Sequence, residues 1–202
     1  EVNAGIVEHN GVEFAIGYQT DRYKPFTASF NYNVTFVNNE VISVNNGVGF
    51  IPGGSFGVGQ DPPARMEDGK PLGYFFGLQT DGIFQNQAEV EAHATQPNAG
   101  PGDLRFVDIN GDGVIDNDDR TDIGNPFPDA TMGLNIALNW NQWDFTAYAF
   151  ASIGNEIVRN YERNQPLVNR SVYTLNRWTG EGSTNTDPRV TTGATSNTLF
   201  SD

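Results

Sequence analysis

Residues 27–36 read TASFNYNVTF, and every second position in this stretch carries an apolar side chain. The apolar positions are Ala28, Phe30, Tyr32, Val34 and Phe36, and the positions between them hold Thr, Ser or Asn. Only an extended strand sends successive side chains to opposite faces. The run therefore predicts a β-strand with one apolar and one polar face.

The same period of two recurs in three other runs, at residues 12–18, 131–140 and 143–151. The clearest of these places Met132, Leu134, Ile136, Leu138 and Trp140 on one face. The last run is less cleanly two-faced, because Tyr148 and Phe150 stand on its otherwise polar side. Together the four runs predict an all-β chain of antiparallel strands.

Composition supports this fold class. Among the 202 residues, Asn, Gly, Thr and aromatic residues are plentiful, and the long Leu/Ala/Glu/Lys stretches that build helices are missing. The formal net charge of −14 argues against nucleic-acid binding, which needs a basic surface. With no cysteine, the chain has no disulfide, zinc–thiolate site or thiol nucleophile.

The connections between the runs come in two lengths. Short ones are expected at residues 19–25 and at Asn141-Gln142, and long ones at 45–129 and 153–202. Short turns at one end of a strand set and long loops at the other are the layout of an outer-membrane barrel. A soluble antiparallel sandwich also alternates, so the pattern by itself leaves both architectures open.

Two details favour the membrane. A strand needs about 9–11 residues to cross a bilayer, and runs 27–37 and 131–140 have that length. Trp140 and Trp143 flank the tight turn, where a barrel carries an aromatic girdle at the level of the lipid headgroups.

A calcium-type motif lies at residues 108–119, which read DINGDGVIDNDD. With Asp108 as position 1, oxygen-bearing side chains fall at positions 1, 3, 5, 9 and 12, and Gly113 is at position 6. This is the spacing of an EF-hand loop, which gathers six to eight oxygens around a hard cation. The predicted calcium ligands are Asp108, Asn110, Asp112, the backbone carbonyl of Val114, Asp116 and Asp119.

Ile115 should point into the fold, and the segments on either side of the loop do not look helical. We therefore expect a structural calcium loop without paired helices. The alternative is an acidic turn without an ion, since Asp, Asn and Gly all favour turns.

No catalytic constellation stands out. His9 and His93 are the only histidines, and neither lies in a metal-ligand pattern. No serine occupies a nucleophile elbow, and the paired Glu89 and Glu91 are explained by a solvated face. The sequence predicts that the chain is not an enzyme.

Several segments resemble the SusC/RagA family of TonB-linked (TonB-dependent) transporters. The most specific is residues 73–85, GYFFGLQTDGIFQ, which is similar to that family's Gly-aromatic stretch running into T-D-G-I-F. The others are residues 10–14 (NGVEF), 101–108 (PGDLRFVD), 120–126 (RTDIGNP) and 177–182 (RWTGEG).

The resemblance implies a piece of a 22-stranded barrel that spans the bacterial outer membrane many times. It implies an N-terminal plug inside the barrel, which this stretch does not contain. It also implies that TonB-ExbB-ExbD supplies energy through that missing N-terminal part. It also implies a SusD-like surface lipoprotein as a lid, and an oligosaccharide or a peptide as the imported substrate.

Together, pattern and resemblance divide the chain into four parts. Residues 1–44 form two barrel strands with a short periplasmic turn, and 45–129 form an extracellular loop with the calcium motif. Residues 130–152 form a barrel hairpin, and 153–202 form a second extracellular loop. Extracellular aromatics are candidates for substrate or lid contact, or else they pack the loops together: Tyr74, Phe75, Phe76, Tyr161, Tyr173 and Trp178.

One alternative remains at this stage. The chain is then a soluble secreted β-domain whose calcium-stabilised loop supports a binding or adhesion module.

Overall fold

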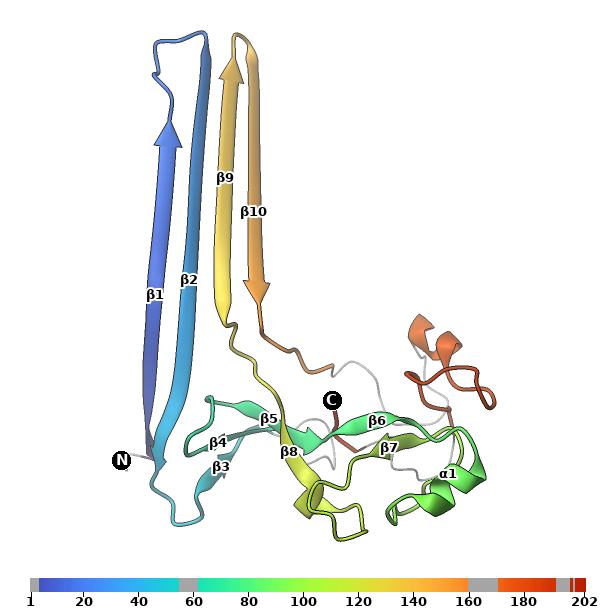
Figure 1. Ribbon diagram of the computed structural model, residues 1–202. Coiled ribbons are helices and arrows are strands. Elements are labelled where there is room, and N and C mark those ends of the chain that lie inside the picture. The colour runs from blue at the N-terminus through green and yellow to red at the C-terminus, as the bar shows by residue number, and fades with distance from the viewer. Residues whose placement is uncertain (1–3, 55–61, 160–170, 192–196, 198) are drawn as a thin grey trace. The chain divides into compact units, whose positions relative to one another are not determined.

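The computed structural model describes residues 4–54, 62–159, 171–191, 197 and 199–202. Antiparallel β-strands dominate it (Figure 1). The chain divides into two compact units. The strand unit comprises Glu1–Pro52, Arg65–Tyr74 and Asn125–Ile157; the loop unit comprises Gly53–Ala64, Phe75–Gly124 and Val158–Asp202. Each unit is described by itself.

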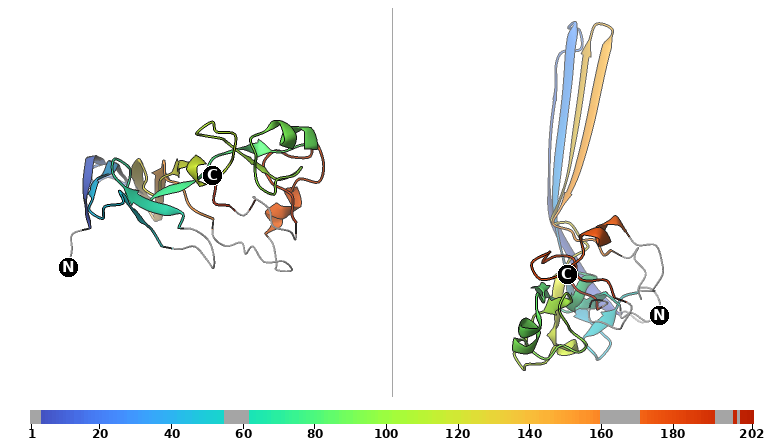
Figure 2. Two further views of the ribbon diagram at one scale, coloured as in Figure 1. Left: turned by 90° about the horizontal axis from the view of Figure 1, so that it is seen from below. Right: turned by 90° about the vertical axis from the view of Figure 1, so that its right-hand side faces the viewer.

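Four long strands build the strand unit: β1 (Gly5–Gln19), β2 (Phe26–Val44), β9 (Ala130–Trp140) and β10 (Trp143–Ile153). They form one antiparallel sheet in the order β1-β2-β9-β10, a single layer in the right-hand view of Figure 2. All four alternating runs of the sequence are therefore strands, and β1 and β2 extend well beyond the predicted runs.

The register aligns the alternation of all four strands. Tyr32 lies opposite Ile16 on β1 and Leu134 on β9, and Leu134 lies opposite Ala149 on β10. Residues directly opposite one another in a sheet point to the same face. The apolar positions of the four runs therefore share one face of the sheet.

Both short connections lie at the same end of this sheet (Figure 1). Trp140 pairs with Trp143, which leaves Asn141 and Gln142 as a two-residue turn, as predicted. Asn141 has a φ of 53°, a left-handed conformation that Asn tolerates better than most residues.

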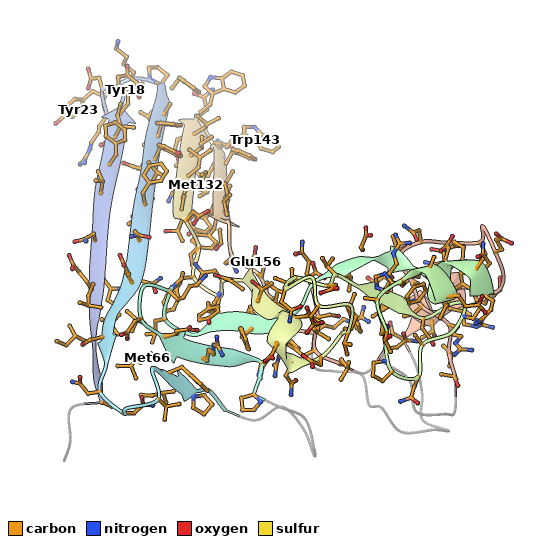
Figure 3. All side chains as sticks on the ribbon, turned by 60° about the horizontal axis from the view of Figure 1, so that its bottom comes forward. Tyr18, Tyr23, Met66, Met132, Trp143 and Glu156 are labelled. Carbon is orange, nitrogen blue, oxygen red and sulfur yellow. The ribbon has the colours of Figure 1, made fainter. Side chains whose placement is uncertain are left out.

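At the other end, β1 and β2 continue past β9 as a two-stranded ribbon with a bulge between Ile6 and Val7. Val41 in this ribbon is buried, and its backbone bonds to Gly69 and Lys70. The short strands β3 (Phe50–Pro52) and β4 (Ala64–Glu67) pair nearby. Met66 packs so closely on the ribbon that a side chain at Gly5 would strike it (Figure 3).

The loop unit has short elements. They are β5 (Tyr74–Leu78), β6 (Thr80–Ile83), β7 (Leu104–Phe106), β8 (Arg120–Gly124), helix α1 (Gln87–Ala92), and the 3-10 turns η1 (Asn117–Asp119) and η2 (Val172–Asn176). Strand β5 pairs with β8, and β6 pairs with β7. Leu78, Phe106 and Ile115 form its buried core.

The long stretch 45–129 is shared between the two units, although the sequence presents it as one loop. Residues 65–74 pack with the long strands, whereas 75–124 pack with the C-terminal stretch. No described helix is both long enough and apolar enough to span a membrane.

Candidate functional site

The apolar face of the long sheet carries many of the exposed large apolar side chains of the strand unit. Its side chains are exposed to an extent unusual for large apolar residues: Trp143 is 77% exposed, Tyr18 66% and Phe145 57%. An exposed apolar face of this size marks a contact with lipid or protein.

The height of this face matches a membrane. From Phe26 to Phe36 it covers about ten residues, or about 33 Å along the strand at about 3.3 Å per residue. A strand tilted by about 45° then spans about 23 Å across the membrane, close to the apolar band of about 25 Å on outer-membrane barrels.

The opposite face is rich in amides and hydroxyls. Asn139 donates from Nδ2 to the hydroxyl of Thr27 at 3.2 Å across the β2–β9 pair. Asn33 packs over Gly133, where an added Cβ would come within 2.6 Å of the Asn33 Oδ1, so a larger residue would make the Asn33 side chain shift. Apart from Tyr148 and Phe150 on β10, this face suits water rather than hydrocarbon.

The predicted calcium loop is organised by its own backbone. The Asp108 carboxylate accepts from the N–H groups of Gly111 and Gly113, at 2.7 and 2.9 Å. Asn110 accepts from the N–H of Asp112, and Asp112 from that of Val114, both at 2.8 Å. The glycines at 111 and 113 have φ of 75° and 85°, so the turn needs residues without a side chain here.

Two residues anchor this loop. Ile115 is buried in the core as predicted, and its N–H bonds to the carbonyl of Thr95. Asp119 is fully buried; its carboxylate accepts from the N–H groups of Ile109 and Asp116, both at 2.9 Å. Asp119 therefore ties the start of the loop to its end.

Strand β7 precedes the loop and β8 follows it, while η1 forms its last three residues, so the expectation that no paired helices flank the loop is confirmed. Within the described ranges, no three His, Asp or Glu side chains converge closely enough to hold a metal ion. The donor set of carboxylate, amide and carbonyl oxygens suits calcium. Because these oxygens do not converge on one point here, the calcium ligands named from the sequence stay a prediction.

The six candidate aromatics lie in different environments. Tyr74 is only 1% exposed, and its hydroxyl bonds to Glu67 and Arg65. Burial raises the pKa of the Tyr74 phenol to about 12, and the hydrogen bond to Glu67 adds to the rise. In this structure the ring face of Tyr74 is therefore unavailable to a ligand, which is the packing role that the sequence left open.

Three of the other candidate aromatics pack within the loop unit. Phe75 makes an edge-on contact with Phe200, and the guanidinium of Arg120 lies 5.0 Å from the centre of the Phe76 ring. Trp178 is half-buried. Tyr173 is 56% exposed and free to meet a ligand, while Tyr161 lies outside the described residues.

Gln85 organises the loop unit, a role that the sequence did not reveal. Its Oε1 accepts from the Trp178 indole N–H at 3.2 Å and from the Gly182 N–H at 2.9 Å. Its Nε2 donates to the carbonyl of Thr184 at 3.1 Å. Segments 73–85 and 177–182, both noted for their family resemblance, are thus joined through one amide side chain.

A second tie holds the same C-terminal stretch. Asp103 is fully buried and forms a two-pronged ion pair with Arg189, at 2.7 and 2.8 Å. The hydrogen bonds to Asp103 raise the pKa of Arg189. Asn197 donates to Asp103 and accepts from the Leu104 N–H, so it bridges the pair to β7.

Comparison with known proteins accounts for both the long strands and the loop motifs. No family model matches the chain. It is 32% identical over 190 residues to TonB-dependent receptor P3 of Formosa agariphila, which covers 92% of this chain and 19% of the receptor. It is 27% identical over 172 residues to TonB-dependent receptor SusC of Bacteroides thetaiotaomicron, covering 84% of this chain and 16% of SusC.

Solved structures agree. The RagAB peptide transporter superposes with a TM-score of 0.57 at 15% identity, over 75% of this chain and 15% of the transporter chain. The RagAB peptide importer in its open-open state superposes with a TM-score of 0.55. This chain belongs with the TonB-dependent receptors of the SusC/RagA type.

The predicted all-β fold is therefore confirmed as part of a SusC/RagA-type barrel, and its location is the bacterial outer membrane. The chain spans about a fifth of the length of the curated receptors that it matches. These relatives are described as receptors and transporters, in agreement with the prediction that the chain is not an enzyme.

Proposed function

We propose that this SusC/RagA-type chain is part of the wall and extracellular loops of a TonB-dependent outer-membrane nutrient importer. The four long strands lie in the membrane, with residues 20–25 and Asn141-Gln142 on the periplasmic side. The stretches 45–129 and 153–202 lie outside the cell. The whole importer takes up an oligosaccharide or a peptide.

One observation carries this proposal. The register places the apolar positions of four strands on one face, at a height that fits the bilayer, and most of the amides and hydroxyls on the other. A soluble sandwich covers its apolar face with a second sheet. The likeness to SusC and to the RagAB transporter supports import as the activity.

Uptake by the full-length receptor that contains this sequence tests the proposal. We expect cells whose receptor lacks residues 75–124 to lose uptake of the cognate nutrient, because the loop unit faces the substrate. The receptor must still reach the membrane, which heat-modified migration on a gel verifies. Unchanged uptake contradicts the proposal. Labelled oligosaccharides and peptides, offered separately, identify the substrate class.

The proposed partners are a SusD-like surface lipoprotein and, through the rest of the receptor, TonB-ExbB-ExbD. The likeness to SusC and RagAB supports both. On this chain the exposed Tyr173 is the best candidate for contact with substrate or lid. Co-purification of a SusD-like protein with the tagged receptor, reduced by Tyr173→Ala but not by Tyr23→Ala, tests the assignment.

We also propose that residues 108–119 bind calcium as a structural ion. The matching spacing supports this, as do the glycine turns and the anchoring of the loop by Ile115 and Asp119. Ion binding requires the oxygens of Asp108, Asp112 and Asp116 to turn toward a common point. Calcium would then neutralise carboxylates that otherwise repel one another.

Calcium titration followed by calorimetry or thermal melting tests this site. We expect Asp112→Ala to abolish most of the stabilisation by millimolar calcium, because it removes a central ligand without changing the Gly113 turn. Asp122→Ala removes the same charge just outside the loop and should keep the response. Equal behaviour of the two variants contradicts the assignment.

A further inference from the structure

The turn between β1 and β2 holds two cations that lack any partner among the described residues. Arg22 and Lys24 are exposed and take part in no side-chain hydrogen bond, ion pair or aromatic contact there. Lys24 contributes only its backbone N–H, to the carbonyl of Asp21.

Cations elsewhere in the described chain are engaged. Arg65 pairs with Glu67, Arg105 with Asp81 and Glu89, and Arg189 with Asp103. Lys70 and Arg120 lie over aromatic rings, Arg177 bonds to the carbonyl of Thr174, and Arg159 also has a partner. In a chain with a net charge of −14, these two unpaired cations within one short turn are available to a partner of opposite charge.

This turn lies beside a row of exposed aromatics. Phe26 pairs with Trp140, and Trp140 with Trp143, so the three rings share the apolar face at its last row. Tyr23, 96% exposed, stands in the same turn, and Figure 3 places it with Tyr18 and Trp143 at this end of the sheet. Aromatic rings of this kind lie at the boundary between hydrocarbon and headgroups.

We propose that Arg22 and Lys24, with this aromatic row, form a binding site for the phosphate of an anionic phospholipid headgroup. The lipid-facing surface runs without a break to Phe26, Trp140 and Trp143, so the headgroup layer begins where the two cations stand. Lys and Arg at such a boundary keep their stems in apolar surroundings and extend their charge to phosphate. The site anchors this end of the sheet at a fixed depth in the membrane.

Nearby acidic groups form no ion pair with these cations among the described residues. Asp21 accepts the Tyr23 N–H with its Oδ1, which shapes the turn, and its charge leaves the turn with a net charge of +1. Asp144 lies on the polar face of β10, opposite Asn139, away from the lipid-facing side. The two cations therefore remain available to a headgroup.

Native mass spectrometry of the full-length receptor in detergent tests this site. Phosphatidylglycerol and phosphatidylcholine with the same acyl chains serve as probes. We expect the double variant Arg22→Gln with Lys24→Gln to reduce the preference for phosphatidylglycerol by about fivefold for each cation removed. This is about the gain in binding that one Lys or Arg provides near an anionic lipid surface. The exchange Arg22→Lys with Lys24→Arg should retain the preference.

Arg177→Gln is the matched control, since it removes an exposed cation from the loop unit. An unchanged preference in the double Gln variant overturns the proposal, as does an equal loss in the control. Full displacement of the lipid by inorganic phosphate would also overturn it, because the site would then hold free phosphate. The inference rests on the proposed membrane orientation, but the lipid preference is measured without uptake, so the two tests fail separately.

Discussion

Along the long strands most large apolar side chains are exposed, whereas the loop unit has a small buried core. Phe145 on β10 is more than half exposed, but Phe84 and Phe106 in the loop unit are fully buried. The strand unit lacks a hydrophobic core of its own along most of its length and depends on lipid and neighbouring strands. The loop unit packs against itself.

Polar ties follow the same division. In the loop unit, Gln85 and Asp103 hold segments that are about a hundred residues apart in sequence. In the long sheet, the polar groups mostly face water and the ladder of backbone hydrogen bonds supplies the order. One chain thus suits two surroundings, because the long strands expose apolar groups where lipid can cover them and the loop unit buries its apolar groups away from water.

The largest expected effect concerns the chain in water without lipid. The isolated 202-residue chain should associate or require detergent, because its apolar face and the two edges of the sheet at β1 and β10 are unsatisfied. Size-exclusion chromatography with light scattering measures this. A monodisperse monomer with a cooperative melt in plain buffer would instead favour a soluble calcium-stabilised module.

A second prediction sharpens the contrast between the two faces of the sheet. In the full-length receptor refolded into vesicles, Leu134→Arg should lower the free energy of unfolding by about 2–4 kcal/mol, because it places a charge in the hydrocarbon. The adjacent Asn135→Arg is the matched control and should cost less than about 1 kcal/mol, because its side chain faces the lumen. Denaturant titration compares the two variants.

Thiol labelling measures which face of the sheet is accessible to water, and it needs no stability measurement. Cysteines at Leu134 and Ile136 should resist an aqueous thiol reagent in the intact membrane, while a cysteine at Asn135 should react. Ready labelling at the two apolar positions with protection at Asn135 would reverse the assignment of faces.

The smallest expected effect concerns the tie between the two loop segments. Gln85→Ala should destabilise the loop unit by about 1–3 kcal/mol, since Trp178, Gly182 and Thr184 each lose a hydrogen-bond partner. Hydrogen exchange across residues 178–185 should accelerate. Gln87→Ala removes only an exposed contact to Glu91 on helix α1 and should leave this exchange unchanged.

Local patterns in the sequence predicted a large part of this structure. The alternation at 27–36 and 131–140 fixed which side chains share a face, and Asn141-Gln142 marked the turn. The spacing of 108–119 identified a loop in which Ile115 turns inward. These features depend on residues close in sequence, so a period or a spacing is enough to reveal them.

Only the tertiary structure showed which distant segments meet. The pairing of β2 with β9, the division of 45–129 between two units and the partners of Gln85 and Asp103 all join residues far apart in sequence. Tyr74 illustrates the reason: its type suits ligand stacking and packing equally, and its burial beside Arg65 and Glu67 decides for packing. A side chain's chemistry is written in the sequence, but its surroundings depend on contacts that no local pattern encodes.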